Sequence, residues 1–172
     1  MDSITRIGSP APNFELEDLE GERHSPRDEF GSILVLNFWS AECVHSQRAD
    51  EEFEDLAKEW GEGVAFWCIA SNENEDDELI RNAAAKNKFD RLLRDQHLAV
   101  ADAYGAITTP HVFVIDEQGV LRYSGAFNDV SLRQRTPTRN YLREAVKAVQ
   151  NGVGPDQSEI APFGCAIIRH SI

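Results

Sequence analysis

Residues 33–46 read ILVLNFWSAECVHS and contain the transition that decides the fold. Residues 33–38 are apolar apart from Asn37, which is typical of a strand buried on both faces. The segment 44–60 places its apolar residues at helical spacing, and Gly61 is a suitable helix end. Cys43 therefore lies between a buried strand and a helix.

The flanking sequence alternates between predicted strands and helices. We expect a hairpin around Glu20-Gly21, strands at 64–70 and 91–95, helices at 76–88 and 97–105, a hairpin of 111–116 with 120–125, and a closing helix at 136–150. This order predicts an α/β fold: a mixed central sheet with helices on both faces and an N-terminal β-hairpin. Residues 1–150 form the predicted domain, and 151–172 form a C-terminal tail that packs on it.

The composition limits the function. Among 172 residues, 30 acids outnumber 17 lysines and arginines, so the formal net charge is −13. This charge argues against nucleic acid or an anionic membrane as a partner. No apolar run reaches the length of about 18 residues that a transmembrane helix needs, and the N-terminus lacks a secretory signal pattern. We expect a reducing, cytoplasmic setting.

The position of Cys43 predicts a reactive thiol. A cysteine in the first turn of a helix meets free backbone N–H groups and the positive end of the helix dipole. Both stabilise a thiolate and can lower a cysteine pKa from about 8.5 to roughly 3.5–7.5. His45 could add positive charge, Ser46 could donate a hydrogen bond to the sulfur, and Glu42 opposes both. The alternative is a buried, inert cysteine.

Three motifs resemble the thioredoxin-fold redoxin family, which includes TlpA-like and peroxiredoxin-like (AhpC/TSA type) proteins. NFWSAECVHS (37–46) is similar to the NFWATWCPPC-like stretch of TlpA-type proteins. GSPAPNFELEDLEGE (8–22) resembles the opening shared by both groups, and ITTPHVFVIDEQGVLRYSG (107–125) resembles their T-P block. The resemblance implies a thioredoxin-like three-layer fold and thiol chemistry.

The resemblance also implies roles for single residues. Cys43 matches the nucleophilic cysteine, and Ser46 stands where the second, resolving cysteine stands in the family. Pro110 matches the proline that follows a cis peptide bond, here after Thr109, and lies against the catalytic cysteine. Such a proline holds a tight turn and leaves a neighbouring backbone group free to pair with a substrate chain.

A CxxS site has no second cysteine to resolve a mixed disulfide at Cys43. Cys43 could instead form mixed disulfides that an outside thiol releases, isomerise disulfides, or reduce peroxide. Peroxiredoxins carry Thr or Ser three residues before the peroxidatic cysteine, where this chain has Ser40, and an arginine near the closing helix, where Arg135 fits. Their proline seven residues before the cysteine is Leu36 here, which weakens the peroxidase interpretation. Arg133 and Arg139 compete with Arg135, and all three could be surface residues.

Two further cysteines remain. Cys68 lies within the predicted strand 64–70 and is interpreted as core. Cys165 lies in the apolar stretch PFGCAII of the tail, next to Gly164, whose freedom permits a backbone turn. A docked, inactive thiol is the simpler interpretation of Cys165, and a resolving role toward Cys43 is the alternative. No cysteine or histidine spacing indicates a metal site.

We therefore expect a redox enzyme that acts through Cys43 without cofactor or metal. The main expectation is peroxiredoxin-like reduction of hydroperoxides by external thiols. The first alternative is a monothiol CxxS thiol-disulfide oxidoreductase or isomerase, and the second is a non-catalytic binding module. The expected partners are a hydroperoxide or protein disulfide as oxidant, and an external thiol or thioredoxin-like reductant.

Overall fold

The computed structural model describes residues 5–87 and 89–170, which fold into strands and helices that alternate along much of the chain. The strands are β1 (Leu16–Asp18), β2 (Arg23–His24), β3 (Ile33–Trp39), β4 (Val64–Ala70), β5 (Arg91–Arg94), β6 (Thr108–Thr109), β7 (His111–Ile115), β8 (Leu121–Gly125), β9 (Glu159–Ile160) and β10 (Cys165–Ala166). The helices are the 3-10 helix η1 (Pro26–Glu29), α1 (Val44–Trp60), α2 (Asp77–Ala84), α3 (Ala99–Tyr104) and α4 (Tyr141–Gln150).

The central sheet has the strand order β2-β1-β5-β4-β3-β7-β8-β9. Its middle strand, β3, runs parallel to β4 and antiparallel to β7. Every residue of β3 is buried, as its continuous apolar sequence predicts. The mixed sheet and the N-terminal hairpin of β1 and β2 are thus confirmed.

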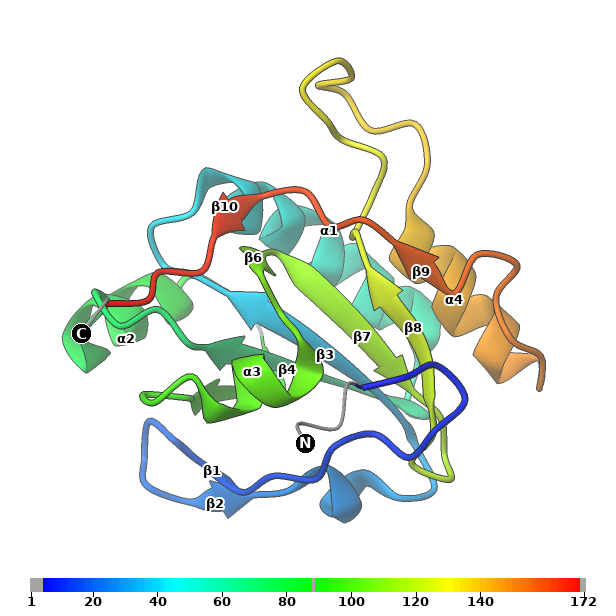
Figure 1. Ribbon diagram of the computed structural model, residues 1–172, viewed down its shortest axis with the longest axis horizontal. Coiled ribbons are helices and arrows are strands. Elements are labelled where there is room, and N and C mark those ends of the chain that lie inside the picture. The colour runs from blue at the N-terminus through cyan, green and yellow to red at the C-terminus, as the bar shows by residue number, and fades with distance from the viewer. Residues whose placement is uncertain (1–4, 88, 171–172) are drawn as a thin grey trace.

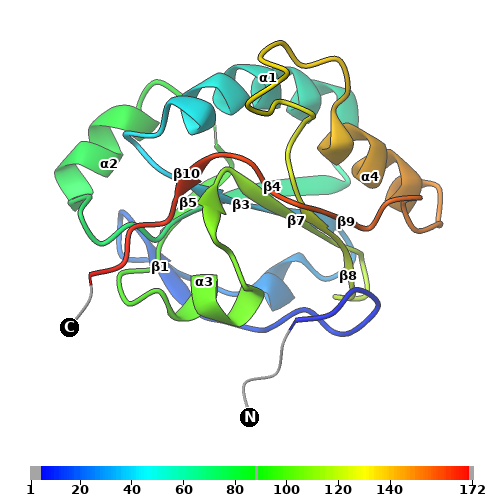
Figure 2. The ribbon, with the colours of Figure 1, turned by 45° about the horizontal axis from the view of Figure 1, so that its top comes forward.

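Helices cover both faces of this sheet (Figure 1, Figure 2). On one face, α1, α2 and α4 bury residues such as Leu56, Ile80 and Val146 against β3 and β4. On the other face, α3 buries Ala101, and Phe14 of the N-terminal segment is partly buried against the same cluster. The result is the expected three-layer α/β arrangement. Within the part of the chain that the structure describes, no helix has the length and apolarity needed to span a bilayer.

Two helices have a boundary more than two residues away from the predicted one. The closing helix begins at Tyr141 instead of Thr136, because the Asn140 side chain caps it by accepting the Arg143 N–H at 2.8 Å. Upstream, the Asp129 carboxylate binds the backbone N–H groups of the two residues before Asn140 and holds them outside the helix. Helix α2 ends at Ala84, and its predicted end at residue 88 lies outside the described residues.

The C-terminal tail follows the edge of the sheet at which β3 ends. In both views, the chain after α4 runs from β9, beside β8, to β10, beside β6 (Figure 1, Figure 2). β9 pairs in parallel with β8, and β10 pairs antiparallel with β6. The Ile167 side chain is buried in the core on the face of the sheet that α3 covers. Residues 151–170 therefore lie against the domain along this edge.

Candidate functional site

Cys43 joins β3 to α1 and presents its sulfur at the beginning of the helix. It is the N-cap residue of α1, and its Sγ accepts the backbone N–H of Ser46 at 3.5 Å. Its residue surface is only 2% exposed. Free N–H groups at a helix N-terminus favour an anion, so this position favours a thiolate when Cys43 is reduced.

One buried carboxylate holds the three residues before Cys43. Glu75, which is 1% exposed, lies between β4 and α2. It accepts hydrogen bonds from the Ser40 hydroxyl, from the Ala41 N–H at 3.2 Å and from the Glu42 N–H at 3.1 Å. Because β3 and β4 are parallel, the loops that follow them meet at one edge of the sheet. Glu75 thus fixes the loop that presents Cys43.

The Thr109-Pro110 peptide bond borders the sulfur on another side. It is cis, as the T-P motif predicts. The Thr109 carbonyl oxygen lies 3.0 Å from Cys43 Sγ, within reach of the thiol proton when Cys43 is reduced. Thr109 and Pro110 therefore lie beside Cys43 in space, although 66 positions separate Cys43 from Thr109 in the sequence.

Cys165 forms a disulfide bond with Cys43. Their Cα atoms are 6.1 Å apart, within the usual range for disulfides. Backbone pairing places Cys165 there, because β10 sets Cys165 opposite Thr109 and Ala166 opposite Thr108. The thiol that the CxxS motif lacks is thus present at the site, carried by the tail.

Two glycines make room for the tail. A Cβ atom on Gly164 would lie 2.2 Å from the Thr109 carbonyl oxygen, and one on Gly125 would lie 1.9 Å from the carbonyl oxygen of Ile160. Gly164 does not have a positive φ, so it does not make the backbone turn that the sequence suggested. Its role is close approach of two backbones, which any side chain would block.

Polar contacts anchor the tail beyond Cys165. The Ile167 N–H donates to the Ile107 carbonyl at 3.0 Å, and the Ile168 N–H donates to the Asn72 side chain at 2.8 Å. Arg169 forms an ion pair with Asp102 on α3. The tail is therefore held by the residue before β6, by the loop after β4 and by α3.

The serines and the histidine predicted near Cys43 have other partners than expected. Ser40 donates to Glu75, and the Ser46 hydroxyl oxygen accepts the Ser40 backbone N–H at 3.4 Å. The Ser46 backbone, and not its hydroxyl, is the group that contacts the sulfur. Burial and nearby Arg48 lower the pKa of His45, so its ring contributes less positive charge than the sequence suggests.

The arginine predicted to support the thiolate lies elsewhere. Arg135 is exposed on the segment between β8 and α4, which projects from the body of the molecule (Figure 1). Arg133 and Arg139 are exposed on the same segment. Among the described residues, no hydrogen bond or ion pair joins Arg135 to Cys43. The carboxylate of Asp129 shapes this segment through local contacts, which the sequence pattern does not reveal.

Asp50 and Cys68 are buried titratable groups in the core on the face that α1 covers. Burial raises the pKa of Asp50 to about 6, against the opposing effect of a 2.9 Å hydrogen bond from the Trp39 indole. Burial also raises the pKa of Cys68 well above its usual value. Cys68 is fully buried in β4 and is the core thiol that the sequence predicts.

A sequence profile of the AhpC/TSA family matches residues 7–124, more than half of the chain. The chain belongs to the AhpC/TSA family. This membership confirms the resemblance carried by the three motifs. The profile match ends within β8. The tail that carries Cys165 therefore lies outside the part of the chain that the family profile matches.

Relatives of this AhpC/TSA chain include thiol-disulfide oxidoreductases. The thiol-disulfide oxidoreductase ResA of Halalkalibacterium halodurans is 36% identical over 119 residues, which are 68% of this chain and 66% of ResA. The chain thus spans just under two thirds of that relative's length. These relatives support an oxidoreductase activity, and they favour the disulfide alternative over the peroxidase that the sequence suggested first. They lend no support to a hydroperoxide substrate.

Solved structures extend the similarity to the tail. A hypothetical protein from Sinorhizobium meliloti 1021 is 28% identical, with a TM-score of 0.83 over 96% of this chain and 95% of its own. An uncharacterized conserved protein from Geobacillus kaustophilus reaches a TM-score of 0.86 over 98% of this chain and 94% of its own, at 24% identity. The thioredoxin-like fold of this AhpC/TSA chain is therefore shown over nearly its whole length.

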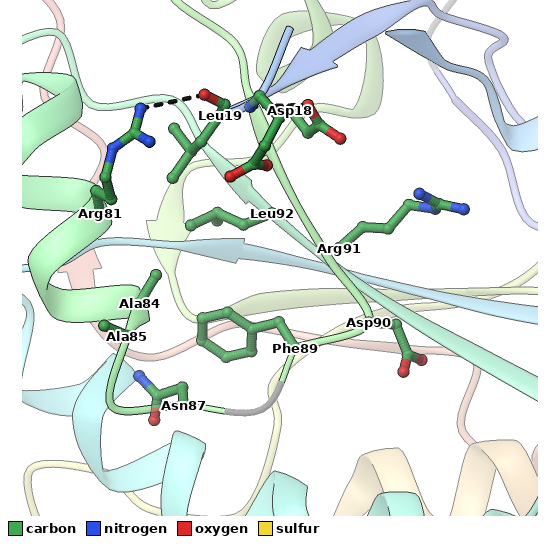
Figure 3. Close-up of a pocket in the computed structure, with 11 residues that line it drawn as sticks. Asp18, Leu19, Arg81, Ala84, Ala85, Asn87, Phe89, Asp90, Arg91 and Leu92 are labelled. Atoms are coloured by element: carbon green, nitrogen blue, oxygen red, sulfur yellow. Dashed lines mark hydrogen bonds between the residues drawn. The ribbon is translucent and has the colours of Figure 1, made fainter. Parts of the chain in front are cut away.

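A pocket lies between the N-terminal hairpin, α2 and β5. This pocket, of about 340 Å³, includes Leu19, Arg81 and Phe89 in its lining, and Arg81 donates to the Leu19 carbonyl (Figure 3). None of its lining residues belongs to the Cys43 site. Its contacts join the hairpin to α2.

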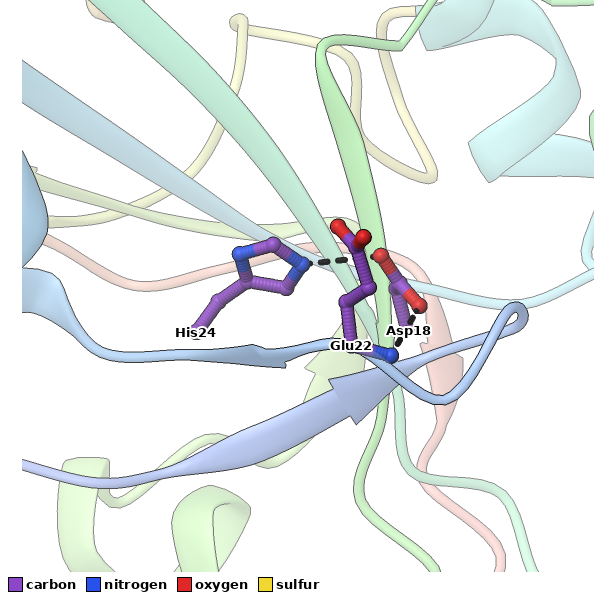
Figure 4. Close-up of side chains that lie close together, drawn as sticks. All are labelled: Asp18, Glu22 and His24. Atoms are coloured by element: carbon purple, nitrogen blue, oxygen red, sulfur yellow. Dashed lines mark hydrogen bonds and ion pairs between the residues drawn. The ribbon is translucent and has the colours of Figure 1, made fainter.

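Asp18, Glu22 and His24 gather beside this pocket (Figure 4). The Asp18 carboxylate lies 2.8 Å from His24 Nε2 and also accepts the Glu22 backbone N–H. The Arg91 guanidinium lies 3.4 Å from the same ring nitrogen. These contacts join the two strands of the hairpin. The positive charge of the Arg91 guanidinium beside His24 disfavours binding of a metal cation by this cluster. We interpret the cluster as structural.

Sequence reasoning missed Glu75, Asn72 and Gly125. Glu75 and Asn72 lie in the acidic stretch SNENEDDE, which the sequence marks only as a loop. One available signal was their place after a strand parallel to β3, because such loops meet at one edge of the sheet. Gly125 had no signal, because its partner belongs to the tail.

Proposed function

We propose that this chain is a thiol-disulfide oxidoreductase in which Cys43 attacks and Cys165 resolves. The observation that carries the proposal is the disulfide between these two residues at the end of β3. It replaces the monothiol alternative of the sequence with a pair of thiols. The second thiol comes from the tail instead of the helix.

The reaction with a protein disulfide has two exchange steps. The Cys43 thiolate attacks one substrate sulfur, a Cys43–substrate disulfide forms, and the other substrate sulfur leaves as a thiolate that takes a proton from solvent. The Cys165 thiolate then attacks Cys43 Sγ, the Cys43–Cys165 bond forms, and the second substrate thiolate leaves and is protonated. The substrate gains two electrons, and the two thiols of the chain lose them.

The surroundings of Cys43 suit both steps. The Ser46 N–H at the sulfur favours the attacking thiolate and, when the disulfide is reduced again, the leaving thiolate. The pairing of β10 with β6 brings Cys165 to the same sulfur. An external thiol or thioredoxin-like reductant would restore both thiols. We retain a cytoplasmic location as part of the proposal, testable by cell fractionation.

The peroxidase interpretation lacks the residues it needs. Ser40 is bound to Glu75, Arg135 is exposed on a projecting segment, and Leu36 stands where peroxiredoxins carry proline. No contact of the described residues supplies a cationic partner for a peroxide at Cys43. Disulfide exchange needs only the two sulfurs and the helix N-terminus.

A comparison of two oxidants tests the proposal. The reduced protein is given either insulin or hydrogen peroxide, each with dithiothreitol as the reductant, and turnover is measured for the wild type, Cys43→Ser, Cys165→Ser and a control, Cys68→Ala. We expect disulfide turnover in the wild type and the control, and loss in Cys43→Ser. When reduced Cys165→Ser is mixed with insulin without dithiothreitol, we expect a Cys43 mixed disulfide to accumulate, seen by mass spectrometry. Saturable peroxide turnover without insulin reduction would overturn the proposal.

A further inference from the structure

The tail lies where a polypeptide substrate of Cys43 would have to lie. We infer that residues 160–168 act as a strap: they occupy the docking site of the substrate's extended segment, and they leave it before the substrate binds. This inference rests on the proposed function and adds to it the segment of this chain that competes with the substrate.

The first observation is that the tail pairs with a strand edge at the site. β6 precedes the cis Thr109-Pro110 bond, and its partner in the two-stranded sheet is β10 of the tail. An edge strand pairs readily with any extended chain, and main-chain hydrogen bonds give such pairing its affinity. Cys165 stands opposite Thr109 in this pairing and is bonded to Cys43. A substrate cysteine on an extended segment would reach Cys43 from the same place.

The second observation is that the docked tail leaves Cys43 almost no access. Cys43 is 2% exposed, and its sulfur contacts the Ser46 N–H, the Thr109 carbonyl and Cys165. Exchange requires the incoming sulfur to reach the Cys43 sulfur directly. The tail must therefore vacate β6 before a protein disulfide can react.

The third observation is that the route of the strap depends on glycine at two points. Gly164 passes Thr109 so closely that a Cβ atom would lie 2.2 Å from the carbonyl oxygen, and Gly125 leaves similar space for Ile160. Beyond these points, the tail is anchored by the Ile167 and Ile168 amides, by the Ile168 carbonyl, which accepts the Glu73 N–H, by Arg169 and by the buried Ile167 side chain. A strap with these anchors docks specifically, and a methyl group on Gly164 would release it.

These contacts define the partner and the order of events. The partner is an extended, disulfide-bearing segment that runs antiparallel to β6, and in the register of the tail the residue before its cysteine is glycine. In the reduced protein the segment displaces the strap and forms the mixed disulfide with Cys43. The strap then returns to β6 and displaces the substrate segment. Cys165 attacks Cys43 Sγ, the mixed disulfide between Cys43 and the substrate breaks, and the substrate leaves as a thiolate. The oxidised protein, with its strap bonded down, excludes further substrate.

The test uses reduced full-length protein in the Cys165→Ser background, where Cys43 reacts and cannot be resolved. The probe is a peptide of residues 160–168, IAPFGCAII, with its cysteine as a thionitrobenzoate disulfide, so that attack by Cys43 releases coloured thionitrobenzoate. Gly164→Ala in the protein releases the strap. Gly154→Ala is the matched control, because a Cβ atom on Gly154 meets nothing within 4 Å.

We expect thionitrobenzoate release by the Gly164→Ala protein to be about tenfold or more faster than by the Gly154→Ala protein. This factor corresponds to about 1.4 kcal/mol of lost competition between the strap and the peptide for β6. On this opened protein, the peptide with Gly164→Ala should react at least about tenfold more slowly than the native peptide, by the same conversion. Equal rates for the two proteins would show that the strap does not gate Cys43. Equal rates for the two peptides would show that the substrate does not use this register.

A second readout separates this inference from the proposed function. Amide hydrogen exchange at Ile167 and Ile168 reports the docked strap without any thiol chemistry. An excess of the peptide in which serine replaces Cys165 should speed this exchange in the Gly154→Ala protein. In the Gly164→Ala protein, these amides should exchange fast even without peptide. If Cys43 fails to react in every variant while exchange behaves in this way, the proposed function fails and the strap stands. If the exchange rates do not change, the strap is wrong.

Discussion

At the scale of single residues, the site depends on backbone donors more than on side-chain charges. The Ser46 N–H contacts the Cys43 sulfur, and the ring of His45 has a lowered pKa. Glu75 contributes by holding the residues that precede Cys43. A carboxylate in this position brings negative charge toward the thiol, so its value to the site must be positional.

Glu75→Gln tests this positional role. The amide keeps the shape of the carboxylate but places an NH₂ group against donors, so we expect the free energy of unfolding to fall by about 1–3 kcal/mol. We also expect slower alkylation of Cys43 in the Cys165→Ser background at fixed pH. The measurements are denaturant unfolding and alkylation rate, with exposed Glu78→Gln on α2 as the control. Faster alkylation, from a lowered Cys43 pKa, would mean that Glu75 acts mainly as a charge.

At the scale of secondary structure, two elements could supply a second thiol to Cys43. One is the first turn of α1, where Ser46 is fully buried three residues beyond Cys43. The other is β10, which carries Cys165. Residues three apart on a helix are neighbours, with Cβ atoms about 5–6 Å apart, so geometry allows either element. The sequence of this chain places the thiol on the strand.

Ser46→Cys should move the disulfide from the tail to the helix. A thiol in the first turn is always beside Cys43, whereas Cys165 must wait for the strap to dock. We expect peptide mapping after mild oxidation to find Cys43 linked to the new cysteine, with Cys165 free to be alkylated. Insulin reduction should then no longer depend on Cys165. Ser46→Ala is the control and should keep the original bond; a Cys43–Cys165 bond that persists in Ser46→Cys would contradict the expectation.

At the scale of the whole molecule, the disulfide ties the centre of the fold to its C-terminal segment. The two cysteines are 122 positions apart in the sequence. The tail also pairs with β8 and β6 and contacts the loop after β4. The redox state of one bond thus controls how firmly a segment of about twenty residues is attached.

The oxidised protein should be more stable than the reduced protein. A bond that closes so long a loop restricts the unfolded chain, and such bonds contribute about 2–4 kcal/mol. We expect denaturant unfolding to give this difference between protein without reductant and protein with a phosphine reductant. Cys165→Ser should give one value under both conditions, close to that of the reduced wild type. Equal stability of oxidised and reduced wild type would show that the bond adds no constraint.

The sequence alone determined the framework of the site. Helix α1 and strand β4 have the bounds that their periodicity predicts, and the cis bond before Pro110 follows from the T-P motif. Periodicity and turn residues act within short windows, so they can be interpreted before the fold is known. The position of Cys43 between a strand and a helix was predictable for the same reason.

Tertiary structure alone decided which groups meet Cys43. Cys165 reaches it through backbone pairing of β10 with β6, and Glu75 reaches its loop because β3 and β4 are neighbours. The predicted Arg135 lies on a projecting segment that local contacts shape. Backbone hydrogen bonds between distant segments involve groups that every residue except proline carries in full, so they leave no pattern in the sequence. Only the folded chain shows that glycine at 164 serves the close passage of two backbones.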